Sequence, residues 1–246
     1  MLSWVNTLTH LLNHWFALPI DRVLFRLDIP PLHPARPISN TLTEEMVIVA
    51  LMVAFFIAVR LMLSVEHPTI PQHFAETVHE FVEDQASQVM GQGYDPHLPI
   101  LTCLLVFILL CNCFGLLPHI ETPTSNPVVP LGLALCAFVY FNWKGIRSQG
   151  VLGYLKHFMG PVGWLAFLMF PIEIFSNLIR ILSLTVRLFA NMLASDLITV
   201  IFFSIFPLAL PLLGLGLHFI VAVIQAYIFM LLNAIYLAEA TAHPEH

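Results

Sequence analysis

Hydrophobic residues run along this chain in long segments that are interrupted at intervals by short polar or proline-rich stretches. Each segment approaches or exceeds the roughly 20 residues that a helix needs to cross a hydrocarbon core about 30 Å thick. The pattern therefore predicts an all-α polytopic membrane protein with about five membrane-embedded helices. The predicted spans are residues 43–65, 98–118, 128–143, 162–206 and 212–240.

Local signals indicate where the first two spans begin and end. Thr43 is expected to cap the first span, with Glu44 and Glu45 in its first turn, where the helix dipole favours negative charge. Pro118 is expected to end the second span, because proline lacks the amide proton that a helix interior needs.

Two segments do not fit the pattern of a spanning helix. Residues 1–42 combine apolar turns with prolines that cluster at Pro30, Pro31, Pro34 and Pro37, which predicts a short interfacial helix followed by an irregular segment. Residues 66–97 carry six acidic residues, and their apolar residues recur at helical spacing. We expect an acidic amphipathic helix outside the hydrocarbon there, with a solvated linker as the alternative.

The last two apolar segments predict a pair of long helices. At 1.5 Å per residue, a helix over 162–206 would be about 68 Å long, more than twice the hydrocarbon thickness. Residues 172–206 contain no glycine or proline at which it would break. We therefore expect the two helices to form a strongly tilted hairpin, with a bend in the first as the alternative.

Composition agrees with a membrane protein and excludes other classes. The 246 residues are 59% hydrophobic and 10% charged, against about 25% charged residues in soluble domains. The net charge of -6 and the nine scattered basic residues leave no basic stripe for nucleic acid.

The four cysteines lie in or beside apolar stretches, so we expect them to be small core residues, and we expect no metal and no cofactor. The first 20 residues do not resemble a removable targeting peptide.

The distribution of basic residues predicts the orientation of the spans. The loop after the second span contains Glu121 and no Lys or Arg, whereas Lys144, Arg147 and Lys156 cluster after the third span. Under the positive-inside rule, the former loop is external and the latter is cytoplasmic.

The first long helix carries charges within its apolar sequence. A charged residue at the membrane centre costs about 2.5–3.5 kcal/mol on insertion scales, so Arg187 is a candidate for function. At about 100° per residue, five polar residues fall within roughly 40° of Arg187, whereas Asp196 falls at about 180°. The stripe indicates a surface that faces water or a moving partner, unless Glu173 and Arg180 only pair with another helix. The five residues are Glu173, Ser176, Arg180, Ser183 and Asn191.

The last helix has a polar face of its own, on which His218, Gln225 and Tyr236 fall within roughly 20° of one another. Asp196 and His218 would share one apolar environment, where a carboxylate and an imidazole can pass on a proton. We interpret them as a candidate proton relay, although His218 alone would be ambiguous. No zinc-protease, nucleophile-elbow or phosphate-loop motif is present in the sequence.

Two segments resemble subunit a of F-type ATP synthases of the bacterial type. Residues 183–192, Ser-Leu-Thr-Val-Arg-Leu-Phe-Ala-Asn-Met, with Asp196 following, resemble the family's signature. His218 and Gln225, with the residues that follow, resemble its last helix. The resemblance is strong over 171–239 and weaker, by order of hydropathy, over 43–156.

The resemblance implies a stator subunit whose long helices embrace a ring of c subunits. The lack of a targeting peptide and the arrangement of Asp196 and His218 favour the bacterial plasma (inner) membrane, with an organellar-encoded chain as the alternative. Arg187 matches the arginine that attracts the c-subunit carboxylate and blocks a direct leak between two offset half-channels. Asn191 and Gln225 match polar residues beside that arginine. The resemblance also implies a b-subunit peripheral stalk and an indirect connection to the F1 sector as partners. It implies no enzyme activity for the isolated chain, and it assigns selection of the ion to the c subunit.

Further positions match the family's proton path. Asp196 and His218 match the half-channel open to the outside, and Glu173 matches an acidic position on the cytoplasmic exit side. Gly115 stands where some bacterial relatives carry an aspartate, and we expect Glu121 or His119 to replace it at the channel mouth. The secondary candidates are Arg180, Ser183, Asn112, His119, Glu121, Tyr236 and Glu239.

Two other classes of function explain the sequence less well. A secondary ion transporter, or another proton-conducting membrane protein of that kind, would combine internal repeats with broken helices, and the sequence shows neither. A membrane-embedded hydrolase would need a nucleophile with a base or a metal set, and Asp196 with His218 has no obvious third ligand.

Overall fold

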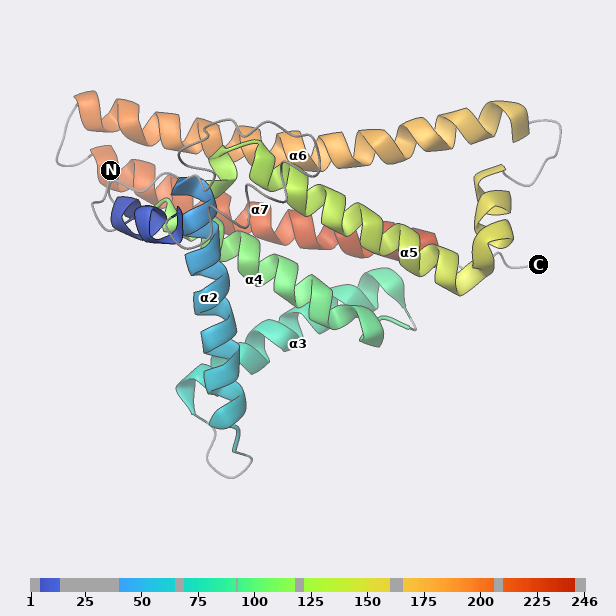
Figure 1. Ribbon diagram of the computed structural model, residues 1–246, viewed down its shortest axis with the longest axis horizontal. Coiled ribbons are helices and arrows are strands. Elements are labelled where there is room, and N and C mark those ends of the chain that lie inside the picture. The colour runs from blue at the N-terminus through green and yellow to red at the C-terminus, as the bar shows by residue number, and fades with distance from the viewer. Residues whose placement is uncertain are drawn as a thin grey trace.

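The computed structural model describes residues 5–13, 40–64, 69–91, 93–117, 122–159, 166–205 and 210–241, and every regular element in these ranges is a helix (Figure 1). Five helices are long and apolar enough to cross a membrane. The predicted all-α polytopic architecture is therefore confirmed. The main helices are α2 (Asn40–Leu61), α3 (Ile70–Met90), α4 (Leu98–Phe114), α5 (Val128–Met159), α6 (Ala166–Ile205) and α7 (Leu210–Thr241).

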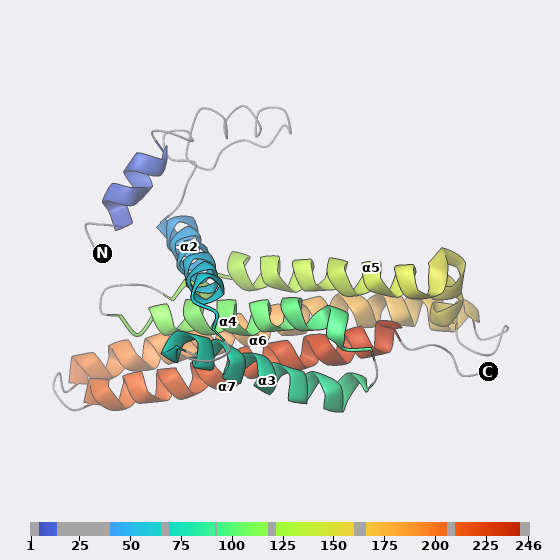
Figure 2. The same ribbon diagram turned by 90° about the horizontal axis from the view of Figure 1, so that it is seen from below.

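The two long helices α6 and α7 pack side by side and form the predicted hairpin, and α6 extends beyond the C-terminal end of α7 (Figures 1 and 2). α6 has 40 residues and continues through Pro171 without a break, which gives a length of about 60 Å at 1.5 Å per residue. α4 and α5 run beside this pair, whereas α2 runs across α4, and α3 packs against α4 and α7.

Several predicted boundaries are wrong. α2 begins at Asn40, so that Thr43 lies inside the helix and no acidic residue is in its first turn. α4 ends at Phe114, before Pro118, where the backbone amides of Gly115 and Leu116 donate to the carbonyls of Asn112 and Cys113, three residues back. A helix can therefore end through backbone turns, without a proline at its end.

The third predicted span, 128–143, is too short. α5 continues through Lys144 and Arg147, and its first segment ends only at Gly150, whose φ of 74° and ψ of 161° are not helical. Lysine and arginine are good helix formers, so the helix extends beyond the apolar stretch that marks the membrane. Gly150 supplies the positive φ that a residue with a side chain rarely adopts.

The amphipathic segment forms the helix α3. Val82 and Ala86 are fully buried against the rest of the molecule, whereas Phe74 and Phe81 are exposed. The predicted amphipathic helix is confirmed, and its position outside the hydrocarbon remains a prediction. Of the N-terminal segment 1–42, residues 5–13 are helical, and the proline-rich part lies outside the described residues.

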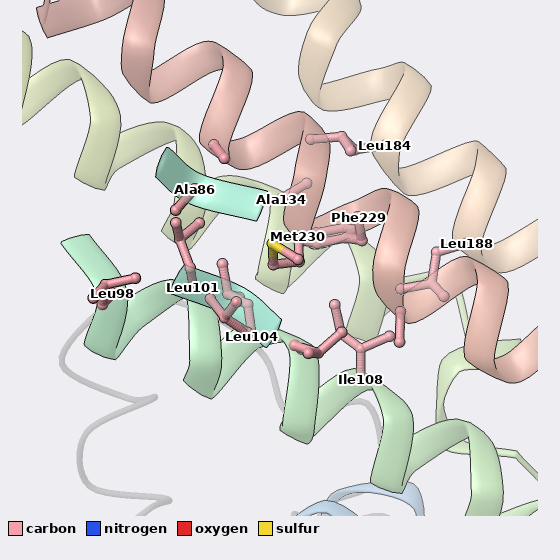
Figure 3. Close-up of a cluster of buried hydrophobic side chains, with 14 of the residues drawn as sticks. Ala86, Leu98, Leu101, Leu104, Ile108, Ala134, Leu184, Leu188, Phe229 and Met230 are labelled. Carbon is pink, nitrogen blue, oxygen red and sulfur yellow. The ribbon is translucent and has the colours of Figure 1, made fainter. Parts of the chain in front are cut away.

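The core lies where α3, α4, α5, α6 and α7 meet (Figure 3). Leu184 and Leu188 of α6 converge there on Phe229 and Met230 of α7 and on Ile108 of α4. These side chains bury one face of α6 only. In the most apolar stretch of α6, 17% of the residues are buried, against 44% in the corresponding stretch of the span that contains α4. α6 is therefore the least covered of the membrane helices.

Candidate functional site

A buried polar cluster joins α4, α6 and α7. Asp196 of α6 and His218 of α7 meet with 3.2 Å between Oδ1 and Nδ1, and the His218 side chain is only 2% exposed. The sequence placed Asp196 and His218 in one apolar environment, and this contact shows that the two side chains meet. On the other side of the ring, Nε2 of His218 lies 3.0 Å from the backbone carbonyl oxygen of Asn112. The imidazole is therefore held between a carboxylate and a backbone carbonyl, with both ring nitrogens engaged.

Asn112 fixes the α4 side of this cluster. Its amide nitrogen donates to the carbonyl of Ala222 in α7 over 3.3 Å, and its amide oxygen accepts a hydrogen bond of 2.6 Å from the Thr124 hydroxyl. Asn112 and Thr124 are both fully buried. Buried polar groups with their partners satisfied hold one geometry, so α4 positions the histidine of α7.

Thr122 was not predicted from the sequence, yet it touches the candidate relay directly. It precedes the short helix η2 (Pro123–Ser125), and its hydroxyl donates a hydrogen bond of 2.9 Å to Oδ1 of Asp196. The loop residues 118–121 lie outside the described part, and with them His119 and Glu121, the two proposed replacements at the channel mouth. The only feature of the sequence that could have indicated Thr122 is that the polar residues Thr-Pro-Thr-Ser follow an apolar span.

Gly115 provides the space in which Thr122 sits. A Cβ at this position would lie 2.9 Å from Cβ of Thr122, closer still to its hydroxyl, and 3.2 Å from Cε1 of His218. The backbone of Gly115 is right-handed helical, so the restriction is one of space. The threonine therefore occupies the volume that a side chain on α4 would need.

We expect Gly115→Ala to displace the η2 loop and to weaken the bond from Thr122 to Asp196. Overpacking of this kind costs about 1–3 kcal/mol, which a lower thermal midpoint of the purified complex and slower proton flux would reveal. Gly132→Ala is the matched control, because nothing lies within 4 Å of a Cβ added there. Equal effects of the two substitutions would contradict this account of Gly115.

Two polar rows flank the contact between α6 and α7. The buried residues of α6 fall between roughly 60° and 160° from Arg187 at about 100° per residue; they are Asn177, Leu184, Thr185, Leu188, Met192 and Ser195. Arg187 at zero and Asp196 at about 180° therefore lie on opposite edges of the buried face. The seam of packed side chains separates them.

Arg187 has few contacts within the described chain. Its guanidinium reaches the Ser183 hydroxyl only at 3.5 Å, which is a long and weak hydrogen bond. No ion pair between described residues involves Arg187, and the residue is half-buried. One turn further along, Asn191 donates a hydrogen bond of 2.9 Å to Gln225 of α7. The polar neighbours named from the sequence thus lie together beside an arginine without a carboxylate.

Arg180 differs from Arg187 because it has a complete set of partners on α7. Its guanidinium lies 2.8 Å from a carboxylate oxygen of Glu239 and 4.9 Å from the centre of the Tyr236 ring. The alternative reading, in which this arginine pairs with another helix, is therefore correct for Arg180. Glu173 is half-buried two turns earlier on α6, and no ion pair between described residues includes it.

The sequence is similar to that of known proteins over most of its length. The family model described as ATP synthase A chain matches residues 44–238. ATP synthase subunit a of Koribacter versatilis is 47% identical over 235 residues, which cover 96% of each chain. The subunit a of Solibacter usitatus is 43% identical over 86% of this chain and 91% of the relative. That of Geobacter sulfurreducens is 37% identical over 87% and 92%.

Proposed function

Because the chain belongs to the family of ATP synthase subunit a, the proton-channel subunit of the membrane-embedded Fo sector, we propose that it separates two half-channels with the charge of Arg187. It is a multi-pass membrane protein and a component of the ATP synthase complex. Each proton that moves through 100 mV releases about 2.3 kcal/mol, so several protons are needed for each ATP.

One observation carries the proposal: Arg187 has no acidic partner in the described chain, whereas Arg180, on the same helix, is paired. A cation without a counter-ion is costly in a membrane, so its partner belongs to another chain. A buried carboxylate on each c subunit has the required charge, and the sparsely covered outer face of α6 leaves room for the c-ring. Arginine suits this role, since its guanidinium stays protonated and cannot itself pass on the proton.

The two half-channels occupy the two flanks of the seam between α6 and α7. On the external side, the path passes through Asp196 and His218, next to the loop that lacks basic residues. On the cytoplasmic side, Glu173 receives the proton after the ring has turned past Arg187. The pair of Arg180 and Glu239 holds α7 against α6 at that end.

The remaining partners follow from the same role. The b-subunit stalk holds this chain still while the c-ring turns, and the F1 sector is connected only through other subunits. The isolated chain performs no ATP chemistry, because it contributes a proton path and a fixed charge. Without a ring, the two half-channels have no group that moves protons between them.

Disulfide cross-linking tests whether the ring faces Arg187. Ala190 is exposed about 60° from Arg187, away from the buried face of α6, whereas Phe189 is half-buried about 160° away. We expect Ala190→Cys to cross-link to a cysteine placed one turn from the c-subunit carboxylate, and Phe189→Cys to remain unlinked. Cross-linking of Phe189→Cys alone would place the ring on the wrong face.

A further inference from the structure

A cavity of about 320 Å³ lies between the first turns of α2 and the loop that carries η2. Thr41 and Glu44 of α2 line one side, and Thr122, Ser125 and Asn126 contribute to the other, together with two prolines. A water molecule takes about 30 Å³ of liquid volume, so the cavity has room for several. Its polar lining favours water over lipid.

Glu44 supplies the acidic side chain among the described residues that line the cavity, and it is only 7% exposed. A carboxylate in such a place costs free energy unless hydration or hydrogen bonds compensate for its burial. The adjacent Glu45 is not one of the described residues that line the cavity.

Thr122 connects the cavity with the candidate relay. It lines the cavity, and its hydroxyl donates to Asp196, which in turn contacts His218. A hydroxyl can accept one hydrogen bond while it donates another, so water that enters the cavity would form a continuous row of exchangeable protons with Thr122 and Asp196. The row ends on the Asp196 side of the seam between α6 and α7.

The charges place this cavity at the external surface. It lies between the first turns of α2 and the loop that leads into α5, and α2 stands beside the start of α5 (Figure 2), whereas Lys144 and Arg147 lie toward the other end of that helix. The positive-inside rule assigns that other end to the cytoplasm.

We propose that this cavity is the outer vestibule of the proton path, in which Glu44 collects protons from water and Thr122 passes them to Asp196. The inference rests on the proposed function, since it extends the outer half-channel from Asp196 to the surface. The vestibule also explains how the path begins in a chain whose Gly115 carries no acidic side chain.

The first test measures passive proton flux through vesicles that contain the complete Fo sector without F1. A positioned proton-transfer group in contact with the reacting atoms contributes about 10²- to 10⁴-fold; water competes with Glu44, so we expect Glu44→Gln to lower the flux by about tenfold. Glu44→Asp should restore most of it. Glu45→Gln removes the same charge one residue away and should leave the flux at the wild-type level.

The second test does not depend on Glu44. A charged, membrane-impermeant methanethiosulfonate should modify Ser125→Cys and block the flux when applied to the outer side only. Ser148→Cys, exposed near the other end of α5, should react from the cytoplasmic side only, with the unsubstituted chain as the background.

The outcomes separate the vestibule from the proposed function. Wild-type flux in Glu44→Gln, or an unreactive Ser125→Cys, would overturn the vestibule. If Asp196→Asn blocks the flux in the same vesicles, the outer half-channel stands and only its entrance is wrong. If Asp196→Asn conducts normally, the proposed relay itself is wrong. Should Glu44→Gln fail to assemble, the labelling of Ser125→Cys decides.

Discussion

ATP-driven proton pumping is expected to fall at least about a hundredfold when Arg187 is replaced by alanine. Removing one partner of a buried ion pair costs about 3–5 kcal/mol, and each 1.4 kcal/mol is a factor of about ten. Without the guanidinium, a deprotonated c-subunit carboxylate would pass α6 uncompensated. The ring then stalls, although the detached F1 sector still hydrolyses ATP.

Fluorescence quenching of a pH-sensitive dye in inverted membrane vesicles measures this pumping. Arg180→Ala is the matched control, because it removes the same charge seven residues earlier, where Glu239 already pairs with it. We expect Arg180→Ala to retain substantial pumping, since its role is to hold α7. Normal coupled pumping by Arg187→Ala would refute the role given to this arginine.

The second large effect is expected for Asp196→Asn. Asparagine can still accept the hydrogen bond from Thr122 and lie beside His218, but it cannot bind and release a proton. Loss of a positioned proton-transfer group lowers a rate by about 10²- to 10⁴-fold. We therefore expect proton flux to fall by this factor in both directions, while the complex still assembles.

Thr122→Val provides the graded comparison for Asp196→Asn. It removes one hydrogen bond to the carboxylate, worth about 1 kcal/mol, which corresponds to a change of about fivefold. The variant should therefore lie between the wild type and Asp196→Asn in stopped-flow measurements of proton uptake. A wild-type flux in Asp196→Asn would show that protons reach the ring by another route.

Much of this architecture follows from the order of apolar and polar residues. The number of spans, the amphipathic α3 and the continuous α6 were all predicted, because a helix in lipid must satisfy its backbone internally over a fixed thickness. The ends of helices were predicted less well. α5 extends beyond its apolar stretch with Lys144 and Arg147, and α4 ends before Pro118.

The sequence predicted those residues of the candidate site that lie on helices, because helical periodicity gives the face on which each one lies. The wheel placed Asp196 on the side of α6 opposite Arg187, where it meets His218, and Asn191 near Arg187, where it meets Gln225. Thr122 lies 74 positions from Asp196 in the sequence, and a loop without regular periodicity carries it. Its position depends on the space above Gly115, which only the packing of α4 against η2 reveals.

The central claim is that Arg187 keeps two half-channels apart, and a ring that cannot rotate tests it most directly. Cross-linking Ala190→Cys to a c subunit should stop passive proton flux completely when Arg187 is present. With Arg187→Ala in the same locked complex, a carboxylate at the interface can exchange protons with both sides. We predict a proton leak across the locked complex, and a locked Arg187→Ala complex that remains proton-tight would contradict the claim.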